Sequence, residues 1–425
     1  MAVDVLAAPV IAALVLIIPK KRRLLIWGTT PIISNKYWSR ALTKAGFQSQ
    51  TLMPEHYPVY RKEDFDLYFA DVTPRFIWPP PLRRALQPLF AFLYIIRNAS
   101  VVHLPFSGGP LGNTYLWRLE AHLWRWAGIR TVLMPYGGDV YVYSRVIDPS
   151  VRNGLLSSYP QAARVERKIA QRVEYWTRRA DVMLTGFMVD GTARWDCALF
   201  YMVVIDTAEW VPKPAYSLHD GRNGRVKVMH TPNHRGFKGT EYLVQAVDEL
   251  KREGLDIELV LLENVPNAQV RELMQGADIL AEQFIIGYAM SAIEGMASGL
   301  PVMSNLENEA YTRVFRRYSY LNECPILSTS PENIKENLRI LVTRPELRRQ
   351  LGQAGRKYVE KYHSEETARY LFGSIYDKIL HGKEVDLMNL FHPLKAEYNR
   401  RKPLIDHPLC ENKLPKTGPN AEKIS

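Results

Sequence analysis

The sequence predicts an α/β protein made of two doubly wound halves, each with a parallel sheet. Three observations predict this class: short apolar runs bounded by polar residues or glycine, helical segments between these runs, and a second such series after Pro212 and Pro214. The 425 residues are enough for two domains. Parallel sheets bind ligands at the carboxyl ends of their strands, so we expect the two halves to face a cleft that holds the ligands.

Each expected strand is a short apolar run, and each expected helix fills the interval before the next strand. In the first half the expected strands are residues 24–28, 100–104, 131–135 and 181–185, and the expected helices are 37–44, 115–126 and 162–179. In the second half the expected strands are 226–230, 257–262, 278–280 and 302–303, and the expected helices are 241–252, 270–274, 289–297, 333–342 and 345–362.

These elements predict five segments along the chain. They are an apolar and basic N-terminal segment (1–23), a first Rossmann-like domain (24–212), a second Rossmann-like domain (213–363), a helix that crosses back to the first domain (364–384) and a mobile tail rich in Pro, Lys and Asn (385–425).

The N-terminal segment carries an apolar run followed directly by basic residues. Residues 5–18 are apolar and uncharged, and residues 20–23 are Lys-Lys-Arg-Arg. At ~1.5 Å per residue, a helix of this run is shorter than the roughly 30 Å hydrocarbon core of a bilayer. Asp4 precedes the run where a secretory signal would have basic residues. We therefore predict a cytoplasmic protein, peripheral at the inner face of the plasma membrane; the alternative is a buried N-terminal helix or an extra strand.

Composition narrows the choice of partners and cofactors. The formal charge of +11 favours anionic partners, among them phosphorylated substrates and anionic membrane surfaces. Cys197, Cys324 and Cys410 lie far apart and show no metal-binding spacing. The aromatic and basic stretch 117–126 has helical spacing, so we interpret it as a packed helix and expect no nucleic-acid partner.

The loop after the strand 226–230 carries two cations before a helix. Its strand ends at His230, a residue that could point into the cleft, and Arg235, Lys238 and Gly239 follow. A helix N-terminus already favours anions, so Arg and Lys three residues apart there suit a diphosphate. The alternative is a solvated basic loop.

A second segment reads Gly-Tyr-Ala-Met-Ser-Ala-Ile-Glu-Gly-Met-Ala-Ser-Gly-Leu-Pro-Val from Gly287 to Val302. Its glycine and small residues allow a ligand to approach the backbone at the start of a helix. Glu294 falls among apolar neighbours in this helix, where a carboxylate needs a partner. A ribose with two adjacent hydroxyls is one such partner, and backbone N–H groups are the alternative.

Together, Lys238-Gly239 and the run Glu-Gly-Met-Ala-Ser-Gly-Leu-Pro-Val from Glu294 resemble the C-terminal domain of retaining GT-B glycosyltransferases, the glycogen-synthase-like and mannosyltransferase-like "group 1" enzymes. The resemblance covers the second half; the first half matches only in layout. It implies a nucleotide-sugar donor and no metal cofactor. Arg235 and Lys238 would neutralise the diphosphate, Glu294 would hold the ribose, and Gly287, with Tyr288 at the helix start, would lie near the phosphates or sugar.

One position departs from the family pattern. Many members carry a second glutamate eight residues before the one that matches Glu294, and this sequence has Ile286 there. Glu282 is near but differs in spacing. The departure bears on which sugar is used and on whether the chain is active.

Candidate residues in the first half are fewer. Asp139 lies in the loop Tyr-Gly-Gly-Asp-Val, which resembles a Gly-x-Asp loop of such enzymes. The resemblance implies that Asp139 would orient a hydroxyl of the acceptor or donor. The alternative is an aspartate that forms a turn by bonding to its own backbone. The loops 28–30 and 107–109 are weaker candidates, and His103 is expected in the core. Asp64-Phe65-Asp66 matches a metal-binding Asp-x-Asp motif, which we interpret as incidental.

The expected activity is transfer of a sugar from a nucleotide-sugar to a lipid-linked or saccharide acceptor, in the synthesis of cell-surface polysaccharide or glycoconjugate. Retention of anomeric configuration is implied by the resemblance alone. Two alternatives are a sugar-nucleotide epimerase of similar fold and a non-catalytic glycosyltransferase-like scaffold, which Ile286 favours.

Overall fold

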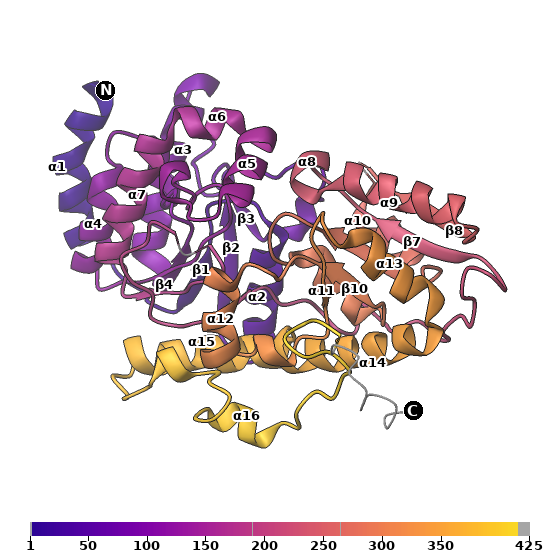
Figure 1. Cartoon of the computed structure of the whole chain (residues 1–425). Coiled ribbons are helices and arrows are strands. Elements are labelled where there is room, and N and C mark those ends of the chain that lie inside the picture. The colour runs from indigo at the N-terminus through magenta and orange to yellow at the C-terminus, as the bar shows by residue number, and fades with distance from the viewer. Residues whose placement is uncertain (1, 189, 264, 415–425) are drawn as a thin grey trace. The chain divides into compact units, whose positions relative to one another are not determined.

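The computed structural model describes residues 2–188, 190–263 and 265–414, and it divides the chain into two compact units (Figure 1). Unit 1 consists of Met1–Ile147, Gln161–Ala198 and Glu365–Met388. Unit 2 consists of Asp148–Pro160, Leu199–Ser364 and Asn389–Ser425. Each unit therefore contains segments that are distant from one another in the sequence.

Unit 1 is built on a six-stranded parallel sheet with the order β3-β2-β1-β4-β5-β6. The strands are β1 (Leu24–Trp27), β2 (Ser49–Met53), β3 (Leu67–Tyr68), β4 (Ala99–Leu104), β5 (Arg130–Leu133) and β6 (Val182–Met183). The α-helices are α1 (Ala2–Ile17), α2 (Ile33–Lys44), α3 (Pro80–Asn98), α4 (Glu120–Trp126), α6 (Pro160–Arg164), α7 (Glu166–Arg179) and α15 (Glu365–Ile379). The sheet is buried because helices cover both of its faces, as expected for parallel strands.

The returning helix α15 completes the core of unit 1. Phe372 packs edge-on against Trp27, and the Tyr376 hydroxyl donates to Nε2 of His103 over 2.9 Å. Nδ1 of His103 lies 3.1 Å from the carbonyl oxygen of Ile26, and burial lowers the pKa of His103 to about 3. His103 is therefore a neutral core histidine, and that prediction is confirmed.

The aromatic stretch 117–126 is a packed element of unit 1. It forms a short 3-10 turn, Trp117–Leu119, followed by α4. Trp124 is fully buried, with its ring 5.9 Å from those of Phe92 and Trp176. Because this indole lies in the core, it offers no surface on which a base could stack.

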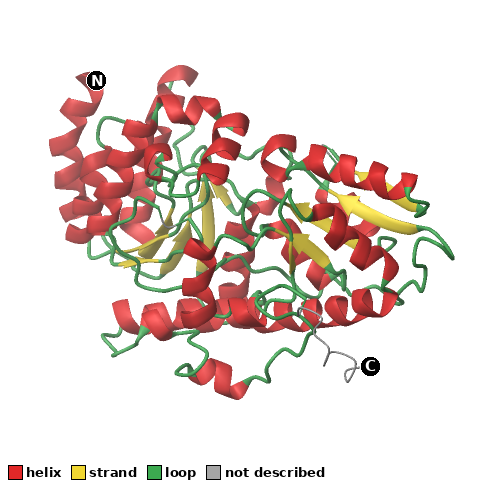
Figure 2. Cartoon of the chain, viewed as in Figure 1, coloured by secondary structure: helices red, strands yellow, loops and turns green. Residues whose placement is uncertain are grey.

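Unit 2 has a five-stranded parallel sheet with the order β11-β10-β9-β7-β8 (Figure 2). The strands are β7 (Val226–His230), β8 (Ile257–Leu261), β9 (Ile279–Gln283), β10 (Val302–Ser304) and β11 (Leu327–Ser328). The α-helices are α5 (Pro149–Ser158), α8 (Arg235–Lys238), α9 (Thr240–Arg252), α10 (Asn267–Met274), α11 (Met290–Ala297), α12 (Glu309–Tyr318), α13 (Ile334–Thr343), α14 (Pro345–Tyr362) and α16 (Glu397–Arg401). Its core lies between the sheet and helices α9 and α13.

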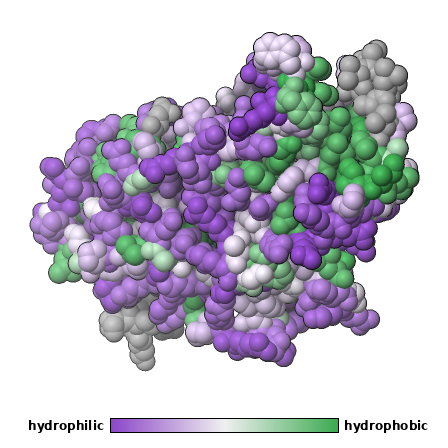
Figure 3. Space-filling model, turned by 180° about the vertical axis from the view of Figure 1, so that it is seen from behind, coloured by the Kyte–Doolittle hydropathy of each residue, from purple (hydrophilic) through white to green (hydrophobic). Residues whose placement is uncertain are grey.

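The N-terminal segment forms α1, whose Ile11 and Val15 are buried in unit 1, while Leu16 and Ile17 are exposed. The side of the molecule that holds α1 and α3 displays much hydrophobic surface (Figure 3). Within the described ranges, no helix combines the length and the hydropathy that crossing a membrane requires.

The chain from residue 385 to 414 differs from the mobile tail that the sequence suggested. It contains α16, and Phe391 and Tyr398 are buried. The Tyr362 hydroxyl lies 2.6 Å from Glu323 and 3.2 Å from Asn399. These buried polar and aromatic contacts fix the segment, which composition alone did not reveal. Residues 415–425 lie outside the described residues.

Candidate nucleotide-binding site

The loop between β7 and α9 holds the two predicted cations, and His230 anchors it. Nδ1 of His230 lies 2.7 Å from the carbonyl oxygen of Ala281, so it carries the proton, and Nε2 accepts from the Thr240 hydroxyl over 2.8 Å. Burial lowers the pKa of His230 to about 4. Both ring nitrogens are used inside the protein, so His230 positions the loop in this structure, and its predicted contact with a donor stays a prediction.

Gly239 lets this loop turn directly from α8 into α9. Its φ of +73° lies in the left-handed region, where glycine carries no steric penalty. A Cβ at this position would lie 3.1 Å from the side chain of Phe284. The glycine therefore serves the backbone turn that places Lys238 over the carboxyl end of the sheet.

Lys238 is buried and forms an ion pair with Glu282 at the end of β9. The two residues are 5% and 1% exposed. Glu282 also accepts from the hydroxyls of Ser291, over 2.7 Å, and Ser304, over 3.0 Å. We call these four residues the Lys238 cluster. The spacing of Glu282 does not match the family motif, so the sequence alone assigns it no role.

Glu294 lies beside this cluster on α11. It is 4% exposed, and Nδ2 of Asn267 donates to its Oε1 over 3.0 Å. Burial raises the pKa of Glu294 to about 7; the Asn267 hydrogen bond and the positive charge of Lys238 act in the opposite direction. Nζ of Lys238 also donates to the Ser291 hydroxyl over 3.4 Å, and Ser291 lies one turn before Glu294 on α11, so the structure places Lys238 and Glu294 in the same part of unit 2.

Arg235 occupies the outer part of the same loop. Its guanidinium is 40% exposed and pairs with Glu241 over 2.7 Å and with Glu263 over 3.2 Å. Hydrogen bonds to these carboxylates raise the pKa of Arg235 further. Both pairs lie at the surface, where exchange for an anionic ligand has a low energetic cost.

Gly287 and Tyr288 face the protein core. A Cβ on Gly287 would lie 2.8 Å from the ring of Phe200. Nδ1 of His363 donates to the carbonyl oxygen of Val203, so its Nε2 accepts from the fully buried Tyr288 hydroxyl over 3.1 Å. Tyr288 therefore packs in the core of unit 2, and its predicted contact with a donor stays a prediction.

Replacing Tyr288 with Phe is expected to lower the free energy of unfolding by about 1–3 kcal/mol, because Nε2 of His363 loses its donor. Nucleotide binding is expected to remain unchanged. Urea denaturation and calorimetric titration check the two expectations. If the variant bound nucleotide more weakly while its free energy of unfolding was unchanged, Tyr288 would be a nucleotide-binding residue.

In unit 1, Asp139 organises the loop that contains it. Its carboxylate accepts the backbone N–H of Phe106 over 2.8 Å and that of Tyr136 over 2.9 Å. Burial raises the pKa of Asp139 to about 6, although these backbone N–H groups oppose the shift. Both carboxylate oxygens are bonded to the backbone, so the turn-forming role that sequence analysis weighed against a catalytic one fits the geometry.

The two weaker candidate loops of unit 1 border a shared cavity of about 200 Å³. Thr29 and Thr30 line it from one loop, and Ser107, Gly108 and Gly109 from the other. The Thr29 hydroxyl donates to the carbonyl oxygen of Gly108 over 2.7 Å, which ties the loops together.

The Asp-x-Asp sequence of unit 1 has structural contacts. Asp64 pairs with Lys36 over 2.6 Å, and Asp66 accepts the backbone N–H of Thr51 over 2.8 Å. Among the residues that the structure describes, no three His, Cys, Asp or Glu side chains are grouped as a metal site would require.

No family model matches this chain, and no curated protein matches it in sequence. Several solved structures share its fold. Sucrose-phosphate synthase from Thermosynechococcus elongatus has a TM-score of 0.53 at 12% identity, over 85% of this chain and 100% of that chain. HepE from Anabaena, solved with UDP-glucose, has a TM-score of 0.52 at 12% identity, over 84% and 99%. TarM has a TM-score of 0.53 at 7% identity, over 84% and 99%. The chain therefore has the two-domain GT-B fold of these glycosyltransferases, as the sequence predicted.

Proposed function

We propose that this protein is a glycosyltransferase that binds its nucleotide-sugar donor in unit 2. The observation that carries the proposal is the placement of Lys238, a buried cation, against Ser291 of α11, one helical turn before the buried carboxyl group of Glu294. Ligands of open α/β sheets bind at the carboxyl ends of the strands. A cation for phosphate and a carboxylate for vicinal hydroxyls are the two groups that a nucleoside diphosphate requires.

Arg235 and Lys238 would then bind the diphosphate and stabilise the negative charge that develops on the leaving nucleotide. Lys238 is held in place by Glu282, so its ammonium is oriented before the ligand arrives. Arg235 would exchange Glu241 and Glu263 for phosphate oxygens. Two cations supply the charge that a divalent metal would otherwise supply, so the proposal includes no metal cofactor.

Glu294 would accept hydrogen bonds from the ribose hydroxyls, with Asn267 orienting its carboxyl group. For the acceptor we propose a saccharide or a lipid-linked saccharide, bound in unit 1 at the cavity between the loops of Thr29 and Gly108. The apolar α1 and the basic residues after it support a peripheral location at an anionic cytoplasmic membrane surface. We also propose that the transfer retains the anomeric configuration of the sugar, and this part rests on the sequence resemblance alone.

Calorimetric titration of the full-length protein with UDP, GDP, CDP and TDP, and with their glucose conjugates, tests donor binding. Incubating the bound conjugate with and without a saccharide acceptor then separates the possible activities. A transferase releases nucleotide faster with acceptor, whereas an epimerase converts the donor alone. No binding of any nucleotide would support the scaffold alternative and contradict the proposal.

Replacing Arg235 with Ala is expected to weaken nucleoside diphosphate binding roughly tenfold and to reduce its salt dependence, because one phosphate contact is lost. Arg178→Ala is the matched control, since Arg178 is also an exposed arginine, paired with Glu174 in unit 1. The control is expected to bind as the wild type does. If the two variants bound the nucleoside diphosphate with equal affinity, Arg235 would not be one of its ligands.

A further inference from the structure

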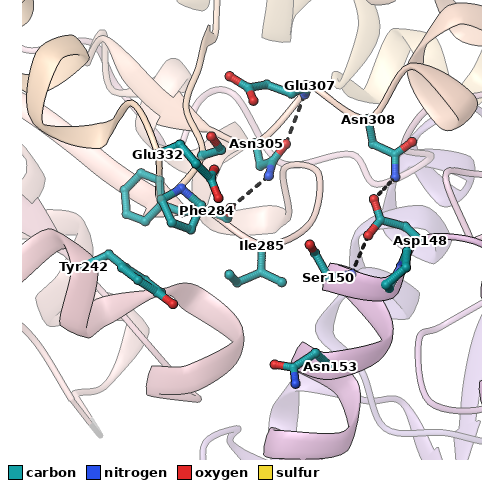
Figure 4. A pocket seen from close by; sticks show the side chains of 13 residues that line it. Asp148, Ser150, Asn153, Tyr242, Phe284, Ile285, Asn305, Glu307, Asn308 and Glu332 are labelled. Carbon is teal, nitrogen blue, oxygen red and sulfur yellow. Dashed lines mark hydrogen bonds between the residues drawn. The ribbon is translucent and has the colours of Figure 1, made fainter.

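Unit 2 contains a cavity of about 690 Å³ at the carboxyl ends of three strands (Figure 4). The loops after β9, β10 and β11 form one wall, and helices α5 and α9 supply the rest. Its lining residues are Asp148, Pro149, Ser150, Asn153, Tyr242, Phe284, Ile285, Asn305, Glu307, Asn308, Ser330, Pro331 and Glu332. The volume lies within the range of roughly 300–1,000 Å³ that is typical of small-molecule sites.

The chemistry of this cavity differs from that of the nucleotide site. Its wall carries three carboxylates, Asp148, Glu307 and Glu332, together with three asparagines and several hydroxyl groups. Lysine, arginine and histidine are absent from the residues described as lining it. A diphosphate would be repelled here, because no cation is present to offset the carboxylates.

Much of the wall is held in place by hydrogen bonds within unit 2. Asp148 accepts the backbone N–H of Ser150 over 2.6 Å and also accepts the side-chain amide of Asn308. The Asn305 side chain donates to the Phe284 carbonyl oxygen over 2.8 Å and accepts the backbone N–H of Glu307 over 3.0 Å. The cavity is therefore a prearranged polar surface, and a ligand would not need to order these groups.

One polar group in this wall lacks a partner. Ser330 is 4% exposed, and its hydroxyl has no hydrogen-bond partner among the described residues. A buried hydroxyl without a partner is costly, and a hydroxyl-bearing ligand would remove that cost. Ser330 is thus a second observation, independent of the carboxylates, that indicates a ligand.

Apolar groups accompany the polar ones. Figure 4 shows Tyr242 on α9 and Asn153 on α5 at opposite sides of the cavity, with Ile285 between them. Tyr242 is 50% exposed, so its ring is available to a ligand. Sugars present hydroxyl groups at their edges and apolar C–H groups on their faces, which is the combination that this wall can contact.

We propose that this cavity is a second ligand site, which binds a saccharide that carries no negative charge. The carboxylates accept sugar hydroxyls, Asn153 and Ser330 complete the polar contacts, and Tyr242 and Ile285 contact the ring face. The inference goes beyond the proposed function and does not depend on it, because saccharide binding is measured without nucleotide and without transfer.

The test is a titration of the full-length protein, followed by saturation-transfer NMR, with glucose, galactose, mannose, maltose, lactose and cellobiose. Glucuronate and glucosamine serve as anionic and cationic probes. At least one uncharged sugar or glucosamine is expected to bind, and glucuronate is expected to bind at least tenfold more weakly than the tightest of them, because the carboxylates repel its negative charge. Asn153→Leu and Glu332→Ala are expected to weaken this binding at least tenfold; both residues are exposed, so both variants should fold, which circular dichroism checks.

Glu336→Ala is the matched control, since Glu336 is an exposed glutamate of α13 that does not line the cavity. It is expected to bind the sugar within twofold of the wild type. Absence of binding by glucosamine and by every uncharged sugar, binding of glucuronate as tight as that of the best ligand, displacement of the sugar by UDP, or wild-type affinity in both cavity variants would each overturn the proposal.

Discussion

Replacing Lys238 with alanine is expected to abolish nucleotide binding and to lower the free energy of unfolding by about 3–5 kcal/mol. The loss of stability follows from Glu282, which is 1% exposed and would keep a buried charge without its ion-pair partner. The hydroxyls of Ser291 and Ser304 would remain as its hydrogen-bond donors but carry no compensating charge. Denaturant unfolding and calorimetric titration measure the two effects.

A double variant separates stability from binding. Lys238→Met combined with Glu282→Gln keeps the shape of both side chains and removes both charges, so most of the lost stability is expected to return. Nucleotide binding is expected to stay absent, because the phosphate contact is still missing. A double variant that binds nucleotide as the wild type does would show that Lys238 acts only in folding.

Replacing Glu294 with glutamine is expected to weaken UDP-glucose binding roughly 10- to 100-fold and to make it independent of pH between about pH 6 and pH 8. In the wild type the carboxyl group, whose pKa is raised to about 7 by burial, loses its proton across this range. Affinity should therefore rise with pH as the carboxylate that accepts the ribose hydroxyls forms. UDP-glucose is a suitable probe because its diphosphate has no group that titrates near neutral pH.

The same shift affects stability with the opposite sign. The folded pKa of Glu294 lies above its ordinary value of 4.5, so the folded state retains the proton more strongly than the unfolded chain does. The stabilisation from this group is fully present below about pH 4.5 and is lost as pH rises through about 7. Relative to Glu294→Gln, the wild type should thus lose stability between pH 5 and pH 8. If the difference in free energy of unfolding between the two proteins did not change over this pH range, the pKa of Glu294 would be an ordinary one.

The sequence predicted the fold class because its strongest signals are local. Strands β1, β4, β5 and β7 fall on predicted apolar runs, and most of their residues are buried. Helices α9, α13 and α14 lie within a residue of their predicted bounds. Elements with weak local signals were missed. Strand β3 has two residues, and α3 begins with prolines and contains Pro88, which argues against a helix when read locally.

The site shows the same limit. Arg235, Lys238 and Glu294 could be proposed from the sequence because they belong to short motifs. The Glu282 partner lies 44 residues from Lys238, and that distance carries no signal in a single sequence. Tyr288 and His230 also belong to the motif segments, but the motifs do not show whether a side chain faces a ligand or the core. In the structure Tyr288 packs against Phe200 and His363, and His230 bonds to Thr240. Asn267 is the first residue of α10 and belongs to no motif.

We infer that Arg235, Lys238 and Glu294 of unit 2 bind one nucleotide together, and a crystal structure of the protein with UDP is the decisive experiment. We expect the diphosphate within hydrogen-bond distance of Arg235 and Lys238 and the ribose hydroxyls at the Glu294 carboxylate. A nucleotide bound elsewhere, with the Lys238 cluster and Glu294 touching no ligand atom, would contradict it.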